Sequence, residues 1–167
     1  FILVDQDGEN QIAVVPGANY SPKLREQSFE EGPGLLVLQL EIGNENNLVV
    51  AALAKKAGWK VVLTPAPSSE FDPKLLEFVD IITLNETEVT QLVGATDFES
   101  AGAELSKLVG LVFVTRGAQG VSVFADGQFL GNVDDMAIVA IDATGAGYTF
   151  CGYEVAGLGQ CLSLLRL

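Results

Sequence analysis

Residues 142–150 have the composition of an anion-binding turn. They read Asp-Ala-Thr-Gly-Ala-Gly-Tyr-Thr-Phe and join an apolar strand-like run to an apolar helix-like run. Small residues let backbone N–H groups converge on one point, and the N-terminus of the following helix adds partial positive charge. This arrangement stabilises a phosphoryl group during transfer. The alternative is a tight turn whose glycines serve close packing.

Two established glycine motifs do not fit this segment. Gly145 and Gly147 match the start of the dinucleotide fingerprint Gly-x-Gly-x-x-Gly, but Phe150 stands at its last position. No Gly-Lys-Ser or Gly-Lys-Thr occurs anywhere, so the P-loop pattern is absent as well. A dinucleotide-dependent oxidoreductase is therefore disfavoured.

Two further segments could contribute to a phosphate site. Residues 114–120, Val-Thr-Arg-Gly-Ala-Gln-Gly, place glycines and a threonine hydroxyl at a strand end, where they can wrap a nucleotide phosphate. A hairpin turn is the alternative. In residues 85–88, Asn-Glu-Thr-Glu, the Asn and the last Glu can order the waters of a Mg²⁺ ion. Their spacing is equally that of a helix capping box.

The elements that must position these segments alternate along the chain. Strands are predicted at 35–40, 60–63, 80–84, 111–115 and 137–141, and helices at 21–31, before Gly58, at 72–79, 85–93 and 98–109, and from 148 onward. This alternation predicts an α/β fold with a mainly parallel sheet flanked by helices. Asp-Gly pairs predict two hairpins, one joining 1–4 to 11–15 and one joining 121–125 to 128–133. The first does not fit the alternation and is interpreted as a small β lid.

Composition excludes several functional classes. The 167 residues suffice for one domain, and 49% of them are hydrophobic, as in a sheet covered on both faces. A net charge of -13 with only 9 Lys and Arg argues against a nucleic-acid partner. The absence of His excludes Ser–His and Cys–His nucleophile pairs and His-based metal sites. No apolar run approaches the roughly 20 residues of a membrane span, so no membrane partner is expected.

The two cysteines, Cys151 and Cys161, are expected to be free. On one helix they lie about 15 Å apart, which is too far for a disulfide. Free thiols are typical of a cytoplasmic protein.

Taken together, the segments occur in the order seen in ribokinase-like (PfkB) sugar kinases, which this chain resembles over nearly its whole length. The resemblance rests on Gln39-Leu40-Glu41, Thr64-Pro65-Ala66-Pro67, Asn85–Glu88, Thr115–Gly120 and Asp142–Gly147, and Pro16–Asn19 resembles the family's lid. It implies residues 1–19 as a remnant of the β lid and residues 20–167 as a partial kinase core. We expect regions at both ends of the family fold to be missing.

The resemblance also implies a function and a set of site residues. The family transfers the γ-phosphoryl group of ATP to a sugar's primary hydroxyl, with ribose to ribose 5-phosphate favoured here. Its cofactors would be ATP and Mg²⁺, with K⁺ as a candidate monovalent cation, and its partners a small sugar and a nucleotide, with room for a homodimer through the lid. The implied roles are sugar contact by Glu41; Mg²⁺ and phosphate binding by Asn85 and Glu88; nucleotide binding by Thr115, Arg116, Gly117, Ala118, Gln119 and Gly120; an anion hole of Gly145, Ala146 and Gly147; and a monovalent-cation site at Asp142 and Thr144.

Two positions depart from the family. Tyr148 stands where the family has the Asp that accepts the sugar hydroxyl's proton, and a phenol, with an ordinary pKa of about 10, is a poor base at neutral pH. Thr64 replaces the Asn that usually precedes Pro-Ala-Pro in the family, which is a milder change. The sequence therefore leaves two functions open: a sugar kinase impaired at its base, or an inactive kinase-like fold that acts as a nucleotide-binding or interaction module.

Overall fold

The structure is a computed structural model that describes residues 1–4, 6, 10–20, 29–68, 71–135 and 145–159. Several predicted features lie outside these residues: the strand at 137–141, Asp142, Thr144, Cys161 and most of the helix at 21–31.

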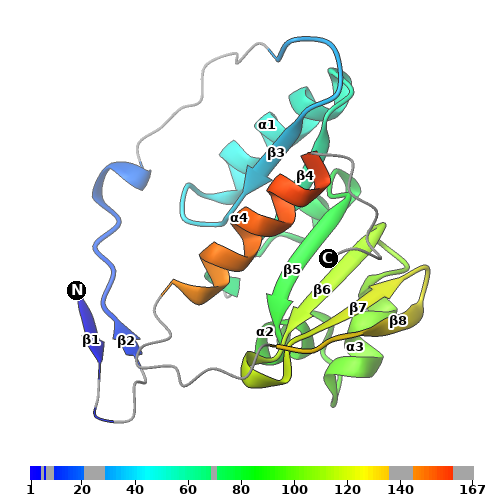
Figure 1. Ribbon diagram of the computed structural model, residues 1–167. Helices are drawn as coiled ribbons and strands as arrows, with labels where there is room; N and C mark the ends of the chain where they lie inside the picture. The colour runs from blue at the N-terminus through cyan, green and yellow to red at the C-terminus, as the bar shows by residue number, and fades with distance from the viewer. Residues whose placement is uncertain (5, 7–9, 21–28, 69–70, 136–144, 160–167) are drawn as a thin grey trace.

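Six strands from the described part of the chain form the central sheet, in the spatial order in which they follow one another in the sequence (Figure 1). They are β3 (Leu35–Leu38), β4 (Lys60–Leu63), β5 (Ile81–Asn85), β6 (Leu111–Thr115), β7 (Val121–Ala125) and β8 (Gln128–Val133). β3 to β6 run parallel, and β7 and β8 complete the sheet as antiparallel strands. The predicted mainly parallel sheet and the hairpin around Asp126-Gly127 are thus confirmed.

Helices cover both faces of the sheet. α1 (Asn44–Lys56), α2 (Glu86–Val93) and α3 (Phe98–Leu105) connect the parallel strands, and α4 (Ala146–Gly159) crosses the opposite face (Figure 1). The predicted helix at 72–79 is a 3-10 helix, η3 (Pro73–Glu77), begun by Asp72, whose side chain accepts a hydrogen bond from the Lys74 amide at 3.0 Å.

The prediction of a helix over 98–109 was too long, because α3 ends at Leu105. The Ser106 hydroxyl donates to the Ala103 carbonyl and accepts from the Gly127 amide, both at 2.9 Å. These bonds tie the end of the helix to the β7–β8 turn, so the chain leaves the helical path there.

The apolar core has two layers, one on each side of the sheet. The larger lies under α1, α2 and α3, and its fully buried members include Leu63, Ile82, Leu84 and Val112. The smaller lies under α4, where the strand residues Val62, Ile81, Leu111 and Phe113 pack with Phe150, Val155 and Leu158. Burying one such side chain stabilises the fold by about 1.5–3 kcal/mol, and the second layer is what holds α4 on the sheet.

The N-terminal hairpin is a sheet of its own. β1 (Ile2–Val4) pairs antiparallel with β2 (Asn10–Ile12), apart from the six-stranded sheet (Figure 1). The predicted separate hairpin is confirmed, with a second strand that ends at Ile12 rather than Val15. An isolated two-stranded sheet is marginally stable in water, and this one exposes apolar side chains, among them Phe1 at 91% and Leu3 at 70%.

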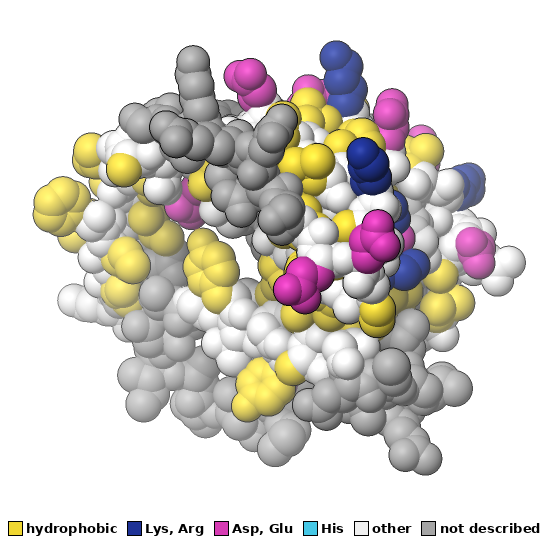
Figure 2. Space-filling view, turned by 90° about the horizontal axis from the view of Figure 1, so that it is seen from above, with side chains coloured by type: hydrophobic (Ala, Val, Ile, Leu, Met, Phe, Trp, Pro, Cys, Tyr) yellow, Lys and Arg dark blue, Asp and Glu magenta, His cyan; other side chains and the backbone are white. Residues whose placement is uncertain are grey.

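In Figure 2, exposed hydrophobic side chains lie on the N-terminal side of the molecule, and Lys and Arg lie among Asp, Glu and further hydrophobic side chains on the other side. No helix in the described part of the chain is long and apolar enough to cross a membrane.

Candidate functional site

The loop after β6 is shaped by its glycines. Thr115 ends β6 and is the register partner of Asn85 at the end of β5, so the two predicted segments lie side by side. Residues Gly117–Gln119 form a 3-10 turn that the Arg116 amide closes by donating to the Gly120 carbonyl at 2.8 Å. Gly120 has φ +81, and a Cβ there would lie 2.0 Å from the Val133 carbonyl oxygen of β8. Only glycine lets the loop approach β8 this closely.

Arg116 anchors this loop to two helix starts. Its Nε donates to Glu86 Oε1 at 3.0 Å, and its guanidinium lies 4.4 Å from the centre of the Phe98 ring. Its Nη2 also donates to the side chain of Gln119. These contacts let Arg116 hold the loop in place, and its role in nucleotide binding stays a prediction.

The first backbone amides of α4 have no hydrogen-bond acceptor within the helix. Gly145 precedes the helix, and its carbonyl accepts both the Thr149 amide at 2.9 Å and the Thr149 hydroxyl at 3.0 Å. The helix dipole gives this end partial positive charge. A phosphate oxygen is a suitable acceptor for these first amides.

A cavity of about 370 Å³ joins the loop to this helix start. It is lined by Thr115, Gly117 and Gly120 from the loop, Ala146, Gly147 and Phe150 from α4, and Val121, Val133, Asp134 and Asp135 from the β7–β8 hairpin and its exit. No Lys or Arg lines it among the described residues. A phosphate bound there would therefore meet backbone amides, and Asp134 and Asp135 line the same cavity.

Asn85 and Glu88 form a capping box. Asn85 Oδ1 accepts the Glu88 amide at 2.8 Å, and Glu88 Oε2 accepts the Asn85 amide at 2.9 Å. The spacing of Asn85 and Glu88 is thus that of a helix capping box, which begins α2 beside the β6 loop. It uses one carboxylate oxygen of Glu88, so a role in Mg²⁺ binding stays a prediction. The described residues contain no cluster of three or more His, Cys, Asp or Glu able to hold a metal.

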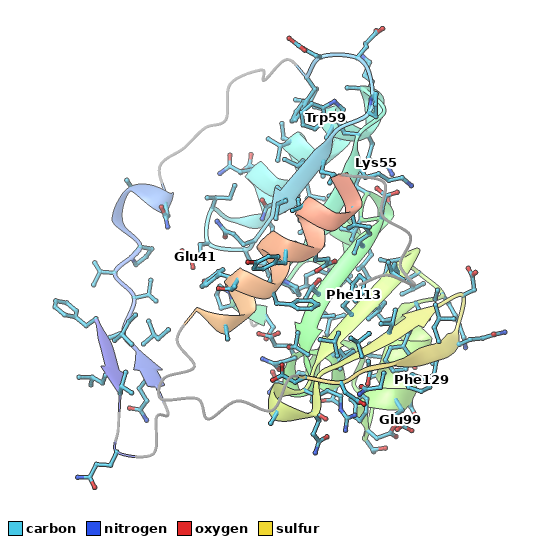
Figure 3. All side chains as sticks on the ribbon, viewed as in Figure 1. Glu41, Lys55, Trp59, Glu99, Phe113 and Phe129 are labelled. Atoms are coloured by element: carbon cyan, nitrogen blue, oxygen red, sulfur yellow. The ribbon has the colours of Figure 1, made fainter. Side chains whose placement is uncertain are left out.

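Glu41 lies on the loop after β3, on the side of the N-terminal hairpin (Figure 3). Its Oε2 accepts a hydrogen bond from Asn19 Nδ2 at 3.4 Å, and its amide donates to the side chain of Gln39. Asn19 belongs to the predicted lid segment, so the lid segment contacts Glu41, the predicted sugar-binding residue. Asp142 and Thr144 lie outside the described residues.

Tyr148 follows the glycine turn on the first turn of α4. Its side chain is 66% exposed and does not line the 370 Å³ cavity. The ring therefore does not fill the cavity, and the place of Tyr148 at the position of a catalytic base stays a prediction.

Sequence reasoning missed a buried acid, Glu154, on the sheet-facing side of α4. It is 3% exposed, and its Oε2 accepts the Thr83 hydroxyl at 2.7 Å. Burial raises the pKa of Glu154 to about 7, although the Thr83 bond acts in the opposite direction. A lone acid among the apolar residues of α4 was the available signal.

Comparisons with known proteins agree with this geometry. The model of the pfkB family carbohydrate kinases matches residues 1–164. The ribokinase of Lactococcus lactis is 37% identical over 95% of this chain and 53% of its own length. That of Haemophilus influenzae is 38% identical over 95% and 55%. The chain thus spans about half the length of these relatives.

Solved structures show the same fold. Ribokinase from Thermotoga maritima superposes with a TM-score of 0.79 at 28% identity, covering 96% of this chain and 55% of that one. Arabidopsis thaliana ribokinase complexed with ribose and ATP superposes with a TM-score of 0.70 at 31% identity, covering 94% and 55%. The family match over nearly the whole chain, the shared fold and the glycine-lined cavity lead to one conclusion: this chain belongs to the pfkB family of carbohydrate kinases.

Proposed function

We propose that the chain is part of an ATP-dependent sugar kinase of ribokinase type, which transfers the γ-phosphoryl group to a sugar's primary hydroxyl, with ribose as the first candidate. The observation that carries the proposal is the cavity between the β6 loop and the N-terminus of α4. It joins two segments about 30 residues apart in sequence, both predicted to hold phosphate, and relatives named ribokinase match both.

The two segments that line the cavity have different proposed roles in phosphate binding. Backbone amides of Gly145, Ala146 and Gly147 bind the transferring phosphoryl group, and Thr115 to Gly120, including Ala118, surround the remaining phosphates. Glycine at position 120 fits this role, because a Cβ would close the approach to β8. ATP supplies the phosphoryl group, and Mg²⁺ offsets the negative charge of phosphates and of Asp134 and Asp135.

The predicted outer contacts complete the site. Asn85 and Glu88 would order the waters of Mg²⁺, Asp142 and Thr144 would lie beside a K⁺ ion, and Glu41 would bind sugar hydroxyls. The Asn19 contact to Glu41 supports a lid that reaches the sugar. The exposed apolar hairpin supports, in addition, a homodimer formed through the lid, which light scattering on the intact chain would test.

We further propose that this chain alone turns over slowly. Tyr148 supplies no carboxylate to accept the sugar proton, and general-base catalysis is typically worth 10²–10⁴-fold. A second candidate function follows from the same residue: a non-catalytic nucleotide-binding module that keeps the cavity and has lost the base.

A coupled assay with ribose and ATP tests both functions. Four proteins are compared: the 167-residue chain and a version completed to the length of a full ribokinase, each with Tyr148 or with Tyr148→Asp. We expect little turnover by both short proteins, because an unheld sugar gains nothing from a nearby base. The completed Tyr148→Asp protein should exceed the completed Tyr148 protein by about 10²–10⁴-fold. Robust turnover by the short Tyr148 protein would contradict the proposal, and equal turnover by the completed pair would remove Tyr148 as the cause.

A further inference from the structure

Helix α4 carries a carboxyl group on the face that it packs against the sheet. Glu154 is 3% exposed, and only its Oε2 is hydrogen-bonded, to the Thr83 hydroxyl of β5 at 2.7 Å. Its Oε1 is buried and has no partner among the described residues. A buried, half-satisfied carboxyl is tolerated far better when neutral than when ionised.

Among the described residues that pack against Glu154, none carries a positive charge that would offset an ionised carboxylate. The sheet faces α4 with Thr83 of β5, Phe113 of β6 and Val123 of β7, and Thr64 directly follows β4. The titratable groups of α4 itself are Tyr148, Cys151 and Tyr153, beside Glu154. On the hairpin side the carboxylates Asp134 and Asp135 follow Val133 in the chain, whereas Lys55 and Lys60 bind Asp80.

The helix links this carboxyl to the phosphate cavity. Glu154 and Phe150 line a second, mostly apolar cavity of about 280 Å³ between α4 and β6–β8. Phe150 lines the 370 Å³ cavity too, and its ring lies 6.2 Å from that of Phe113, which Figure 3 shows beneath α4. Movement of α4 away from the sheet would therefore displace Gly147 and the first amides of the helix.

We propose that Glu154 is a positioning residue whose protonation state controls the docking of α4: the neutral carboxyl keeps the helix on the sheet, and ionisation loosens it together with the Gly145–Gly147 turn. The docking step stands on the structure alone. Its consequence for phosphate rests on the proposed function.

The size of the effect follows from proton linkage. The pKa of Glu154 is about 7 when the helix is docked and 4.5 as its ordinary value. The docked state therefore holds the proton more tightly, and docking weakens as pH rises from 4.5 to 7 and then levels off. Between pH 6 and pH 8 the equilibrium constant for release of α4 should rise about tenfold.

The thiol of Cys151 reports on docking. It is buried, on the same helix, and accepts a hydrogen bond from the Thr64 hydroxyl at 3.4 Å. In a Cys161→Ser background, we would measure its labelling by a disulfide reagent at pH 6 and pH 8 in the wild type, in Glu154→Gln and in Glu104→Gln, an exposed acid on α3. Because each variant has the same thiol, the ratio of its rate to that of Glu154→Gln at the same pH removes the chemistry of the thiolate.

The expected ratio for the wild type rises about tenfold between the two pH values, and the Glu104→Gln protein follows the wild type. Amide protection, corrected for the intrinsic exchange rate at each pH, should fall in α4 and not in β5 or β6, which separates release of the helix from global unfolding. If Glu154→Gln fails to fold, Glu154→Leu serves as the neutral reference. A ratio that does not change with pH, or corrected protection that falls equally in β5, would overturn the proposal.

Titration with Mg·ADP at the two pH values separates this inference from the proposed function. Weaker binding at pH 8 in the wild type, but not in Glu154→Gln, supports both. A pH-dependent labelling ratio without any binding of Mg·ADP supports the docking control and rejects the proposed function. Binding of Mg·ADP without a pH-dependent labelling ratio supports the proposed function and rejects the docking control.

Discussion

Replacement of Gly120 by Ala tests the shape of the β6 loop most sharply. Gly120 has φ +81 and ψ -138, close to a region essentially reserved for glycine, where another residue costs about 1–3 kcal/mol. In addition, the new Cβ would meet the Val133 carbonyl oxygen at 2.0 Å, well inside the roughly 3.5 Å of a favourable carbon contact. The loop and the end of β8 would have to separate. We expect a loss of about 3 kcal/mol or more from the free energy of unfolding.

Gly117→Ala is the matched control on the same loop. Gly117 also has positive φ, at +54, but a Cβ there meets nothing within 4 Å. Its cost should therefore be that of the left-handed backbone alone, about 1 kcal/mol. Urea unfolding followed by far-UV circular dichroism gives both values, with the slope checked for constancy. Equal destabilisation by the two variants would refute the steric reasoning.

Three further predictions concern other contacts. Asp80→Asn should lower the free energy of unfolding by about 2 kcal/mol in the same urea experiment. Burial acts to raise the pKa of Asp80, but hydrogen bonds, led by that from Lys55, outweigh it and lower the pKa. The stability contributed by Asp80 is therefore present above pH 3.8 and lost as pH falls below it, and the Asn variant should not show this loss. Arg116→Ala should lower the free energy of unfolding by about 1 kcal/mol, because it removes the bond to Glu86 and the stacking on the Phe98 ring. Arg116→Lys should not restore this stability, because an ammonium lacks the guanidinium fork. Full stability of the Lys variant would contradict this reasoning. Tyr148→Asp in the 167-residue chain should leave ribose phosphorylation near background in the coupled assay, and a 10²-fold gain would show that the base was the only defect.

The sheet could be predicted from sequence because its strands are short apolar runs separated by clear breakers. β4 and β6 to β8 have the predicted bounds, and the hairpin turn at Asp126-Gly127 is where the Asp-Gly pair places it. Helix ends were harder to predict. α3 stops at Leu105 because Ser106 bonds to the distant Gly127, and no local pattern records a contact between residues 21 positions apart.

The candidate site was predictable in outline for a related reason. Segments that follow neighbouring parallel strands meet at one edge of the sheet, so Asn85 and Thr115 had to lie together. The use of individual side chains was not predictable: Arg116 turns to Glu86 and Phe98, and Asp134 joins the cavity through the path of β8. Glu154 escaped notice because a single acid on a helix is usually solvated, and only the packing of α4 shows that it is buried.

We propose that the cavity between the β6 loop and α4 binds nucleotide phosphate. Amide NMR spectra of the 167-residue chain during titration with Mg·ADP would test this binding, because they report on each backbone N–H. We expect shifts for Gly117, Gly120, Ala146 and Gly147, with binding weaker than submicromolar because the chain spans only about half the length of its relatives. No shift at saturating nucleotide, or shifts confined to residues away from this cavity, would contradict it.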